Sequence, residues 1–435
     1  MKFQTERPAS WQTCGSCGNE VVETDPLPRC KLCQGLLEVR HRPPEASAAE
    51  LVRRFTERRG GSPGATASGV WRFREVVLPS AESVVSHPEG NTPLLHRVAL
   101  DRWSGVDRLL LKHEGYNPTG SFKDRGMTVG VTQALRIGAQ AVACASTGNT
   151  SASLAAYAAQ AGIPALVLVP HDGVALGKLA QTLAYGARTL LVRGDFDQCL
   201  RLVEHAATEL GVYLLNSVNP FRIEGQKTIL LELLQQLSWE PPAWIVFPAG
   251  NLGNTAAFGK ALREAREWGL IPRLPRLAAV QAEGAAPFAR SFAEGFSQRY
   301  RVKAETVATA IKIGDPASYE RAVAAILETD GIVLSVPDTE ILDAKAAIDA
   351  AGVGCEPASA ASLAGLRRLV QRGVIRPGES VVAILTGHIL KDPGLLLNYH
   401  QVMDPPPAGA NRPVEIEPTL AALERVLHGQ GVNNR

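Results

Sequence analysis

One lysine lies in a setting where its amine can act as a nucleophile. Lys123 belongs to the segment Asn117–Gly126 (NPTGSFKDRG), in which Asn-Pro and Gly120 predict a turn and the pattern over Met127–Leu135 predicts a helix. With Ser121 as the N-cap, Lys123 falls in the first helical turn, where free backbone N–H groups lower the pKa of an amine. A lysine becomes a nucleophile only when it is neutral. Most lysines are simply exposed charges, so this segment alone does not establish chemistry.

Two loops that each join a strand to a helix offer places for anionic groups. The first, Ala145–Ser153 (ASTGNTSAS), precedes an alanine-rich helix, which its threonine and serine side chains (Thr150, Ser151) can cap and whose N-terminus offers donors to a carboxylate. The second, Pro248–Thr255 (PAGNLGNT), has two glycines that let its backbone fold around an anion. Its G-x-x-G spacing is not a dinucleotide fingerprint and suits a single phosphate. Each loop alone also fits an ordinary strand-to-helix connection.

An α/β scaffold must position these segments. Short apolar runs alternate with amphipathic segments from about Val70 to Tyr399, which predicts parallel sheets covered on both faces by helices. Thr386, at the end of the last strand, has a neutral hydroxyl that could face a ring nitrogen, although an ordinary strand end fits as well. The predicted strands are Ala141–Ala145, Ala165–Val169, Thr189–Val192, Trp244–Phe247, Leu277–Ala282 and Ser380–Leu385. The predicted helices are Thr150–Gln160, Leu176–Tyr185, Phe196–Leu210, Gln226–Leu237, Thr255–Trp268 and Thr339–Ala351.

The composition is that of a globular protein with a small-molecule pocket. The chain has 435 residues, enough for two or three domains, with 45% apolar and 20% charged residues. Its formal net charge of +2, from 45 basic and 43 acidic residues, argues against nucleic-acid or membrane partners. No secretory signal and no run of membrane-spanning length are visible, and an odd number of cysteines favours the reducing cytoplasm. We expect a cysteine unit at 1–41, a linker at 42–65, a catalytic region at 66–403 and a tail at 404–435.

Four cysteines near the N-terminus have the spacing of a metal site. Cys14 and Cys17 form one C-x-x-C pair, and Cys30 and Cys33 form a second pair twelve residues later. Four thiolates in this arrangement typically close a tetrahedral structural zinc site, a zinc ribbon. A redox pair or unmetallated thiols are the alternatives. A closed four-thiolate site has no open position, so a catalytic metal is not expected.

Taken together and in this order, the segments closely resemble the fold-type II pyridoxal-phosphate enzymes, and the threonine synthase family within them. The resemblance extends from Gly90-Asn91-Thr92-Pro93-Leu94 to about Asp392. Similar zinc ribbons precede some members of that family. The segments typical of threonine synthases in particular are Asn117–Gly126, Asn216–Arg222 followed by Glu224–Lys227, Ala308–Ile311 and Glu356–Ala361.

The resemblance implies a fold and a set of residue roles. The fold is α/β, with two three-layer α/β/α domains of mostly parallel strands (the smaller at about 116–220) after the small zinc ribbon. Lys123 is implied as the catalytic residue and the Schiff-base lysine of pyridoxal 5′-phosphate. The other implied cofactor ligands are Asn149 at the 3′ oxygen, Gly250, Asn251, Leu252, Gly253 and Asn254 at the phosphate, and Thr386 at the pyridine nitrogen. The implied substrate ligands are Thr147, Thr150 and Ser151 at the carboxylate, and Asn216, Ser217 and Arg222 at a second phosphate. Many relatives have Gly or Ala in place of Leu252, a departure that we expect to be harmless.

The implied activity is that of a lyase of threonine biosynthesis, which converts O-phospho-L-homoserine and water to L-threonine and phosphate. A cysteate synthase acting on phosphoserine is the closest alternative. A threonine or serine dehydratase needs no second phosphate site. Outside this chemistry, the intact Lys123 disfavours a silent cofactor-binding protein, and the near-neutral charge disfavours a ribbon-mediated nucleic-acid adaptor. A homodimer fits the family.

Overall fold

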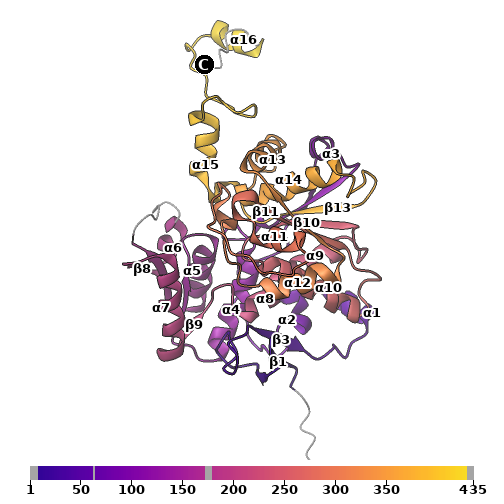
Figure 1. The fold of residues 1–435 in the computed structure, drawn as a ribbon, viewed down its shortest axis with the longest axis vertical. Helices are drawn as coiled ribbons and strands as arrows, with labels where there is room; N and C mark the ends of the chain where they lie inside the picture. The colour runs from indigo at the N-terminus through magenta and orange to yellow at the C-terminus, as the bar shows by residue number, and fades with distance from the viewer. Residues whose placement is uncertain (1–7, 62–63, 172–178, 429–435) are drawn as a thin grey trace, which may run out of the picture. The chain divides into compact units, whose positions relative to one another are not determined.

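The computed structural model describes residues 8–61, 64–171 and 179–428, and its strands form three sheets (Figure 1). The strands are β1 (Ser10–Cys14), β2 (Glu20–Val22), β3 (Leu37–His41), β4 (Leu94–His96), β5 (Leu109–His113), β6 (Ala141–Ala145), β7 (Ala165–Pro170), β8 (Arg188–Val192), β9 (Val212–Leu214), β10 (Trp244–Pro248), β11 (Arg276–Ala282), β12 (Ile332–Val336) and β13 (Val381–Leu385).

The α-helices of the described part lie mostly between the strands in the chain. They are α1 (Ala48–Gly60), α2 (Arg74–Val77), α3 (Val98–Ser104), α4 (Lys123–Arg136), α5 (Asn149–Ala161), α6 (Ala180–Ala184), α7 (Phe196–Glu209), α8 (Pro220–Gln226), α9 (Thr228–Gln236), α10 (Gly253–Glu267), α11 (Pro287–Ala293), α12 (Tyr319–Glu328), α13 (Asp338–Ala350), α14 (Pro357–Gln371), α15 (Pro393–Leu397) and α16 (Leu420–Leu427).

The smaller α/β sheet has the order β8-β7-β6-β9, and all its strand pairs are parallel. Alternate residues of a strand point to opposite faces, and both faces of β6 are buried. Val142 and Cys144 share a core with α5, whereas Ala143 packs with Cys199 and Val203 of α7. Helices therefore cover both faces of this sheet, in the magenta part of Figure 1.

The larger sheet has the order β12-β11-β10-β13-β5-β4, and β4 is its antiparallel strand. Its central strand β10 is buried on both faces: Phe247 packs edge-on against Phe258 of α10, and Trp244 shares the opposite core with α14. Two three-layer arrangements of mostly parallel strands confirm the predicted fold class. The third sheet, β2-β1-β3, is antiparallel and belongs to the cysteine unit.

The predicted elements are largely present. All six predicted strands form, with ends that differ by a residue or so, while β4, β5, β9 and β12 of the two α/β sheets were not predicted. The predicted helix Gln226–Leu237 is α9, separated from α8 by Lys227. The predicted helix Leu176–Tyr185 is shorter, as α6, and its residues 176–178 lie outside the described part. By compactness, residues 1–391 form one unit and residues 392–435 a second. None of the helices described is long and apolar enough to cross a membrane.

Candidate active site

The segment that carries Lys123 is fastened to the end of strand β13. Ser121 forms an antiparallel bridge with Gly387, and the N–H of Phe122 donates to the Thr386 carbonyl at 3.0 Å. Helix α4 begins at Lys123, which confirms the predicted first-turn position. The prediction that Ser121 is the N-cap is wrong: Phe122 holds that position, and Ser121 Oγ accepts only from the Lys123 N–H, at 3.4 Å. The bridge to Gly387 has taken Ser121 out of the capping geometry.

The surroundings of Lys123 favour the neutral form of its amine. Its Nζ lies 4.2 Å from the centre of the Phe122 ring and donates no hydrogen bond within the described part of the chain. The pKa of Lys123 is lowered to about 7, first by burial and then by the positive charge of Arg222, with the carboxylate of Glu356 opposing both. A substantial fraction of the amine is therefore neutral near pH 7, as a Schiff-base nucleophile requires.

Close packing of α4 on α8 brings Arg222 toward Lys123. A Cβ on Gly225 would lie 1.8 Å from the Arg125 carbonyl oxygen, and one on Gly126 would lie 3.1 Å from the Arg222 carbonyl oxygen. Only glycine allows the two backbones to come this close. Helix α8 starts where Asn219 Oδ1 accepts the N–H groups of the first turn. The short segment before α8 thus sets the place of Arg222.

Arg222 is a buried cation with donors to spare. It is 1% exposed, and its Nη1 donates to the Leu215 carbonyl at 3.0 Å. Its Nε and Nη2 are buried without any partner among the described residues. Burial lowers the pKa of Arg222 to about 10, so it stays charged at neutral pH. Leaving two guanidinium donors unpaired is costly unless an anion occupies the site.

The two other predicted phosphate ligands lie beside it but are partly engaged. Asn216 Oδ1 accepts from the Ala145 N–H and its Nδ2 donates to the Ala145 carbonyl, both at 3.0 Å, so one amide N–H remains for a ligand. Ser217 Oγ accepts from Asn251 Nδ2 at 2.6 Å. This bond joins the predicted substrate-phosphate segment to the predicted cofactor-phosphate loop.

The loop between β10 and α10 fits a phosphate group. A Cβ on Gly250 would lie 2.9 Å from the Ile311 Cα, so the loop can pass there only with glycine. Asn251 Oδ1 accepts from the Ala317 N–H at 2.6 Å, which fixes the loop from the other side. The unpaired N–H groups of the first turn of α10 point at an anion placed there. The buried hydroxyl of Thr255, in that turn, has no partner among the described residues.

Leu252, which we expected to be a harmless departure, has an unfavourable backbone conformation. It has φ +62° and ψ 11°, the left-handed region that costs a non-glycine residue on the order of 1 kcal/mol. Its side chain is 2% exposed and packs in the main core, which offsets this strain. The loop can still hold a phosphate, although its residue at the start of α10, Leu252, has a strained backbone.

The start of α5 is open toward a ligand. Thr150 and Ser151 were predicted to cap this helix, and that prediction is wrong: Gly148 is the N-cap and no side chain caps it. Ser151 Oγ instead donates to the Gly148 carbonyl at 2.9 Å and accepts from Thr182 Oγ1 at 3.1 Å. Thr147 and Thr150 are half-buried. The free N–H groups of α5 remain available for a carboxylate.

A buried carboxyl group that we did not predict as a site residue connects two predicted cofactor ligands. Glu356 is 3% exposed; its Oε2 accepts from Asn149 Nδ2 at 2.8 Å, and its Oε1 lies 2.9 Å from Thr386 Oγ1. Thr386 Oγ1 also lies 2.9 Å from Ser359 Oγ. Burial raises the pKa of Glu356. Only its place in the Glu356–Ala361 segment could have pointed to it.

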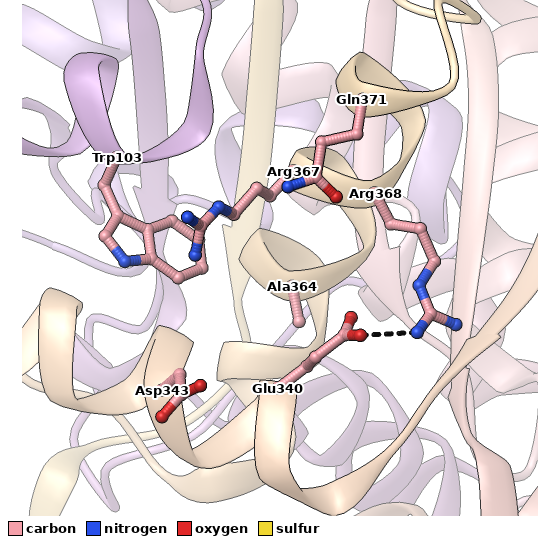
Figure 2. Close-up of a pocket in the computed structure, with 7 residues that line it drawn as sticks. All are labelled: Trp103, Glu340, Asp343, Ala364, Arg367, Arg368 and Gln371. Carbon is pink, nitrogen blue, oxygen red and sulfur yellow. Dashed lines mark hydrogen bonds and ion pairs between the residues drawn. The ribbon is translucent and has the colours of Figure 1, made fainter. Parts of the chain in front are cut away.

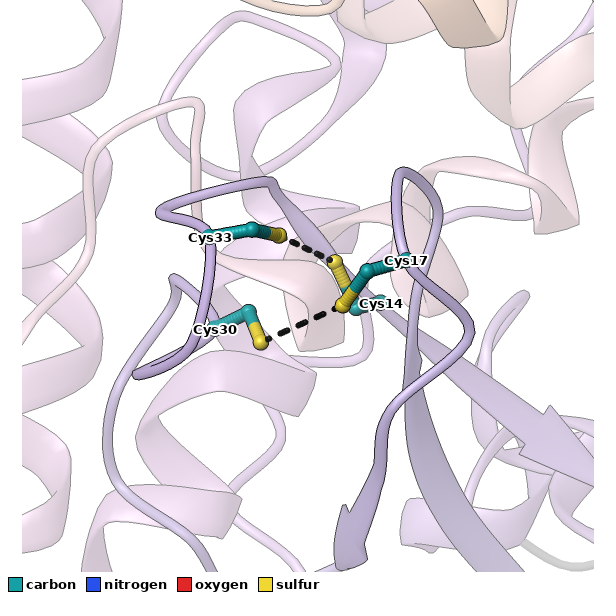
Figure 3. A group of neighbouring side chains, drawn as sticks. All are labelled: Cys14, Cys17, Cys30 and Cys33. Atoms are coloured by element: carbon teal, nitrogen blue, oxygen red, sulfur yellow. Dashed lines mark hydrogen bonds between the residues drawn. The ribbon is translucent and has the colours of Figure 1, made fainter.

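The four N-terminal cysteines converge. Their Sγ atoms all lie within 4.8 Å of one another, with Cys14 and Cys33 at 3.4 Å and Cys17 and Cys30 at 3.7 Å (Figure 3). The N–H two residues after the first cysteine of each pair donates to that cysteine's sulfur at 3.4 Å. Such bonds lower the pKa of Cys30 to about 7. The donor set and its hydrogen bonds fit a tetrahedral zinc ion.

A surface hollow between α3, α13 and α14 is separate from all of these groups. In it Arg367 stacks over the Trp103 ring at 4.5 Å, and Arg368 pairs with Glu340 (Figure 2). None of the predicted site residues lines it.

Comparisons with known proteins show the family of the chain. Residues 85–387 match the family model "pyridoxal-phosphate dependent enzyme". The chain is 43% identical to a threonine synthase of Methanosarcina acetivorans, over 96% of this chain and 98% of that protein, and 47% identical to a threonine synthase of Synechocystis, over 71% and 79%. Two solved structures share the fold. A processed threonine deaminase from Solanum lycopersicum has a TM-score of 0.61 at 21% identity, covering 82% of this chain and 94% of that one. Maize serine racemase has a TM-score of 0.62 at 22% identity, covering 76% and 95%. The chain belongs to the pyridoxal-phosphate dependent enzyme family, in the group that contains the threonine synthases.

Proposed function

We propose that this enzyme is a threonine synthase, which converts O-phospho-L-homoserine and water to L-threonine and phosphate. The observation that carries the proposal is the pair of buried Arg222 donors, Nε and Nη2, that have no partner among the described residues. Arg222 acts on the charge of Lys123 and lies on a segment distinct from the loop that fits the cofactor phosphate. A substrate with its own phosphate matches that second anion site. The threonine synthases found among the relatives support the same reaction.

The residues fit pyridoxal phosphate. Lys123 would bind the aldehyde carbon, the Gly250–Asn254 loop the phosphate, Asn149 the 3′ oxygen, and Thr386 the ring nitrogen. The bound cofactor would supply an electron sink for a pair released at the substrate carbon. These roles are proposals from the geometry and from the resemblance.

We infer that the residues around Lys123 direct the proton transfers. Once the substrate amine replaces it, the free Nζ of Lys123, left neutral by its lowered pKa, would take the proton from the α carbon. It would have to pass that proton on to the bound cofactor before it takes a second one from the β carbon. The N-terminus of α5 orients the substrate carboxylate. Arg222 holds the phosphate on the γ carbon and stabilises its charge as it leaves.

Measuring phosphate release from O-phosphohomoserine and from O-phosphoserine tests the proposal. We expect the enzyme to release phosphate and threonine from O-phosphohomoserine and not to turn over O-phosphoserine. The Lys123→Ala variant should turn over neither substrate. Phosphate release from phosphoserine alone would assign a cysteate synthase instead. Ammonia release from serine or threonine without a phosphorylated substrate would assign a dehydratase.

We also propose that Cys14, Cys17, Cys30 and Cys33 bind a structural zinc ion. Metal analysis of the purified protein should give about one zinc per chain, and Cys14→Ser should lose it. Cys199→Ser, a cysteine outside the cluster, is the matched control and should keep it. Full zinc content in Cys14→Ser would contradict the site. A homodimer and a cytoplasmic location remain predictions from the sequence.

A further inference from the structure

Ser359 and Glu356 each lie within hydrogen-bond distance of the Oγ1 atom of Thr386, the predicted ring-nitrogen ligand. Ser359 Oγ accepts from the N–H of Thr386 at 2.8 Å and from the N–H of Gly387 at 3.1 Å. Both of its lone pairs are then used, so its own O–H donates to Thr386 Oγ1, at 2.9 Å. Thr386 is left with one O–H and one lone pair. These remain for Glu356 and for one further partner.

The protonation of Glu356 decides whether Thr386 offers its O–H or its lone pair to that further partner. When Glu356 is ionised, its Oε1 accepts the O–H of Thr386 at 2.9 Å, and the threonine presents a lone pair. When Glu356 is protonated, the carboxyl O–H donates to that lone pair, and Thr386 presents its O–H instead. Asn149 Nδ2 donates to Oε2 at 2.8 Å and so keeps the carboxyl group oriented in both states.

We propose that Glu356 and Thr386 form a proton relay to the cofactor's ring nitrogen. As the proton leaves Glu356 Oε1 for Thr386 Oγ1, the Thr386 proton passes to the ring nitrogen. The relay holds one proton besides that of the Thr386 hydroxyl, so the ring nitrogen is protonated when Glu356 is ionised and bare when Glu356 is protonated. The proposal rests on the placement of the cofactor given above. Glu356 acts through Thr386 and is therefore a positioning residue.

The surroundings of Glu356 leave both states accessible. Burial favours the protonated carboxyl group and raises its pKa, whereas the charges of Lys123 on α4 and Lys391 in the short helix Ile389–Lys391 favour the ionised form. The neighbouring Cys355 has its pKa raised to above the usual range by burial and stays a neutral thiol. The hydroxyl of Thr386 alone would leave the ring nitrogen bare. With a carboxyl group behind it, the ring can gain and lose a proton without exposure to water.

The test is the NMR chemical shift of the ring nitrogen in the holoenzyme, with the cofactor labelled with ¹⁵N at that atom and no substrate present. In the wild type we expect the signal to lie between the positions of a bare and a protonated pyridine, because the ring nitrogen shares a proton with Glu356 and this internal transfer does not itself depend on pH. In Glu356→Gln, the amide N–H always donates to Thr386, so the threonine O–H always points to the ring. We expect that signal to stay at the bare position at every pH. Ser359→Ala is the control, because it disturbs Thr386 but keeps the carboxyl group, and its signal should still be displaced from the bare position.

Three results would overturn the relay. They are a wild-type signal at the bare position, a Glu356→Gln signal displaced from the bare position like that of the wild type, and a Ser359→Ala signal that lies at the bare position together with that of Glu356→Gln. If Glu356→Gln fails to bind the cofactor, the wild-type signal decides: a displaced position supports the relay and the bare position overturns it. Because no substrate is needed, an enzyme that acted on another substrate would still give this readout. The phosphate-release assay therefore judges the proposed reaction separately.

Discussion

His41 and Glu224 lie 183 residues apart in the sequence and share a 2.7 Å hydrogen bond between Nε2 and Oε2, with both side chains at most 1% exposed. Burial lowers the pKa of His41, so the ring is neutral, donates from Nε2 and accepts from Ser10 Oγ at Nδ1. Glu224 belongs to α8, two residues after Arg222. The last strand of the cysteine unit is thus bonded directly to the helix that carries the proposed phosphate ligand.

His41→Ala should therefore weaken both the fold and the substrate site. Glu224 would keep its bonds to Lys227 and Lys260 but lose its bond to the cysteine unit. Loss of a buried hydrogen bond to a charged group costs about 2 kcal/mol in the free energy of unfolding. We also expect a raised KM for O-phosphohomoserine with little change in kcat. His205→Ala, at an exposed histidine, should change neither. Unchanged stability of His41→Ala would show that the contact contributes nothing.

Arg222→Met should impair recognition of the substrate phosphate while keeping the volume of the side chain. Loss of a charged, bidentate contact costs roughly 2 to 3 kcal/mol, or about 30- to 150-fold in kcat/KM for O-phosphohomoserine. Cofactor binding should be retained, because the Gly250–Asn254 loop is untouched. Steady-state kinetics and cofactor absorbance measure the two effects. A normal kcat/KM would remove Arg222 from the phosphate site.

The rate at which the apoprotein takes up pyridoxal phosphate should follow the neutral fraction of Lys123. With its pKa lowered to about 7, the rate should rise with pH up to about 7 and level off above it. Arg222→Met removes a positive charge that lowers this pKa, so the whole profile should move to higher pH. A rate that keeps rising through the ordinary range of lysine would show that the amine is not perturbed.

The parts of the site that the sequence revealed are those encoded within a few residues. The turn before Lys123, the glycines at Gly250 and Gly253 and the two C-x-x-C pairs each carry their chemistry in a local pattern. The capping predictions at Ser121 and Thr150 failed, because a cap depends on backbone geometry that a remote contact can change. At Ser121 that contact is the bridge to Gly387.

The groups that the sequence did not reveal act through long-range contacts. The bond of Glu356 to Asn149 joins residues 207 positions apart. The resemblance singles out the Glu356–Ala361 segment, but nothing within that segment shows which residues its carboxyl group meets. The same holds for His41, which looked like the end of the cysteine unit and nothing more. In both cases the strand order decides which residues meet, and one sequence does not encode that order in any short segment.

Glu232→Gln should test the buried charge cluster that fixes α4 in place. Glu232 accepts from Lys112 at 2.5 Å, from Arg125 at 2.9 Å and from Arg72 at 2.7 Å, and all four side chains are at most 1% exposed. Its loss leaves these three cations with Glu114, which pairs with Arg125 at 2.6 Å. Removing one partner from a buried ion cluster costs about 3–5 kcal/mol in the free energy of unfolding.

The same substitution should also make the free energy of unfolding depend less on pH in the acidic range. These cations hold the pKa of Glu232 well below its ordinary value. A carboxyl group with a lowered pKa in the folded state stabilises the fold above its unfolded pKa, and that contribution is lost as the pH falls toward the folded pKa. The free energy of unfolding, measured with denaturant, should therefore fall more steeply on acidification for the wild type than for Glu232→Gln. Glu240→Gln, at an exposed position, should follow the wild type in both stability and slope. Equal slopes for the wild type and Glu232→Gln would mean that Glu232 is not the group whose ionisation holds α4, and with it Lys123, in place.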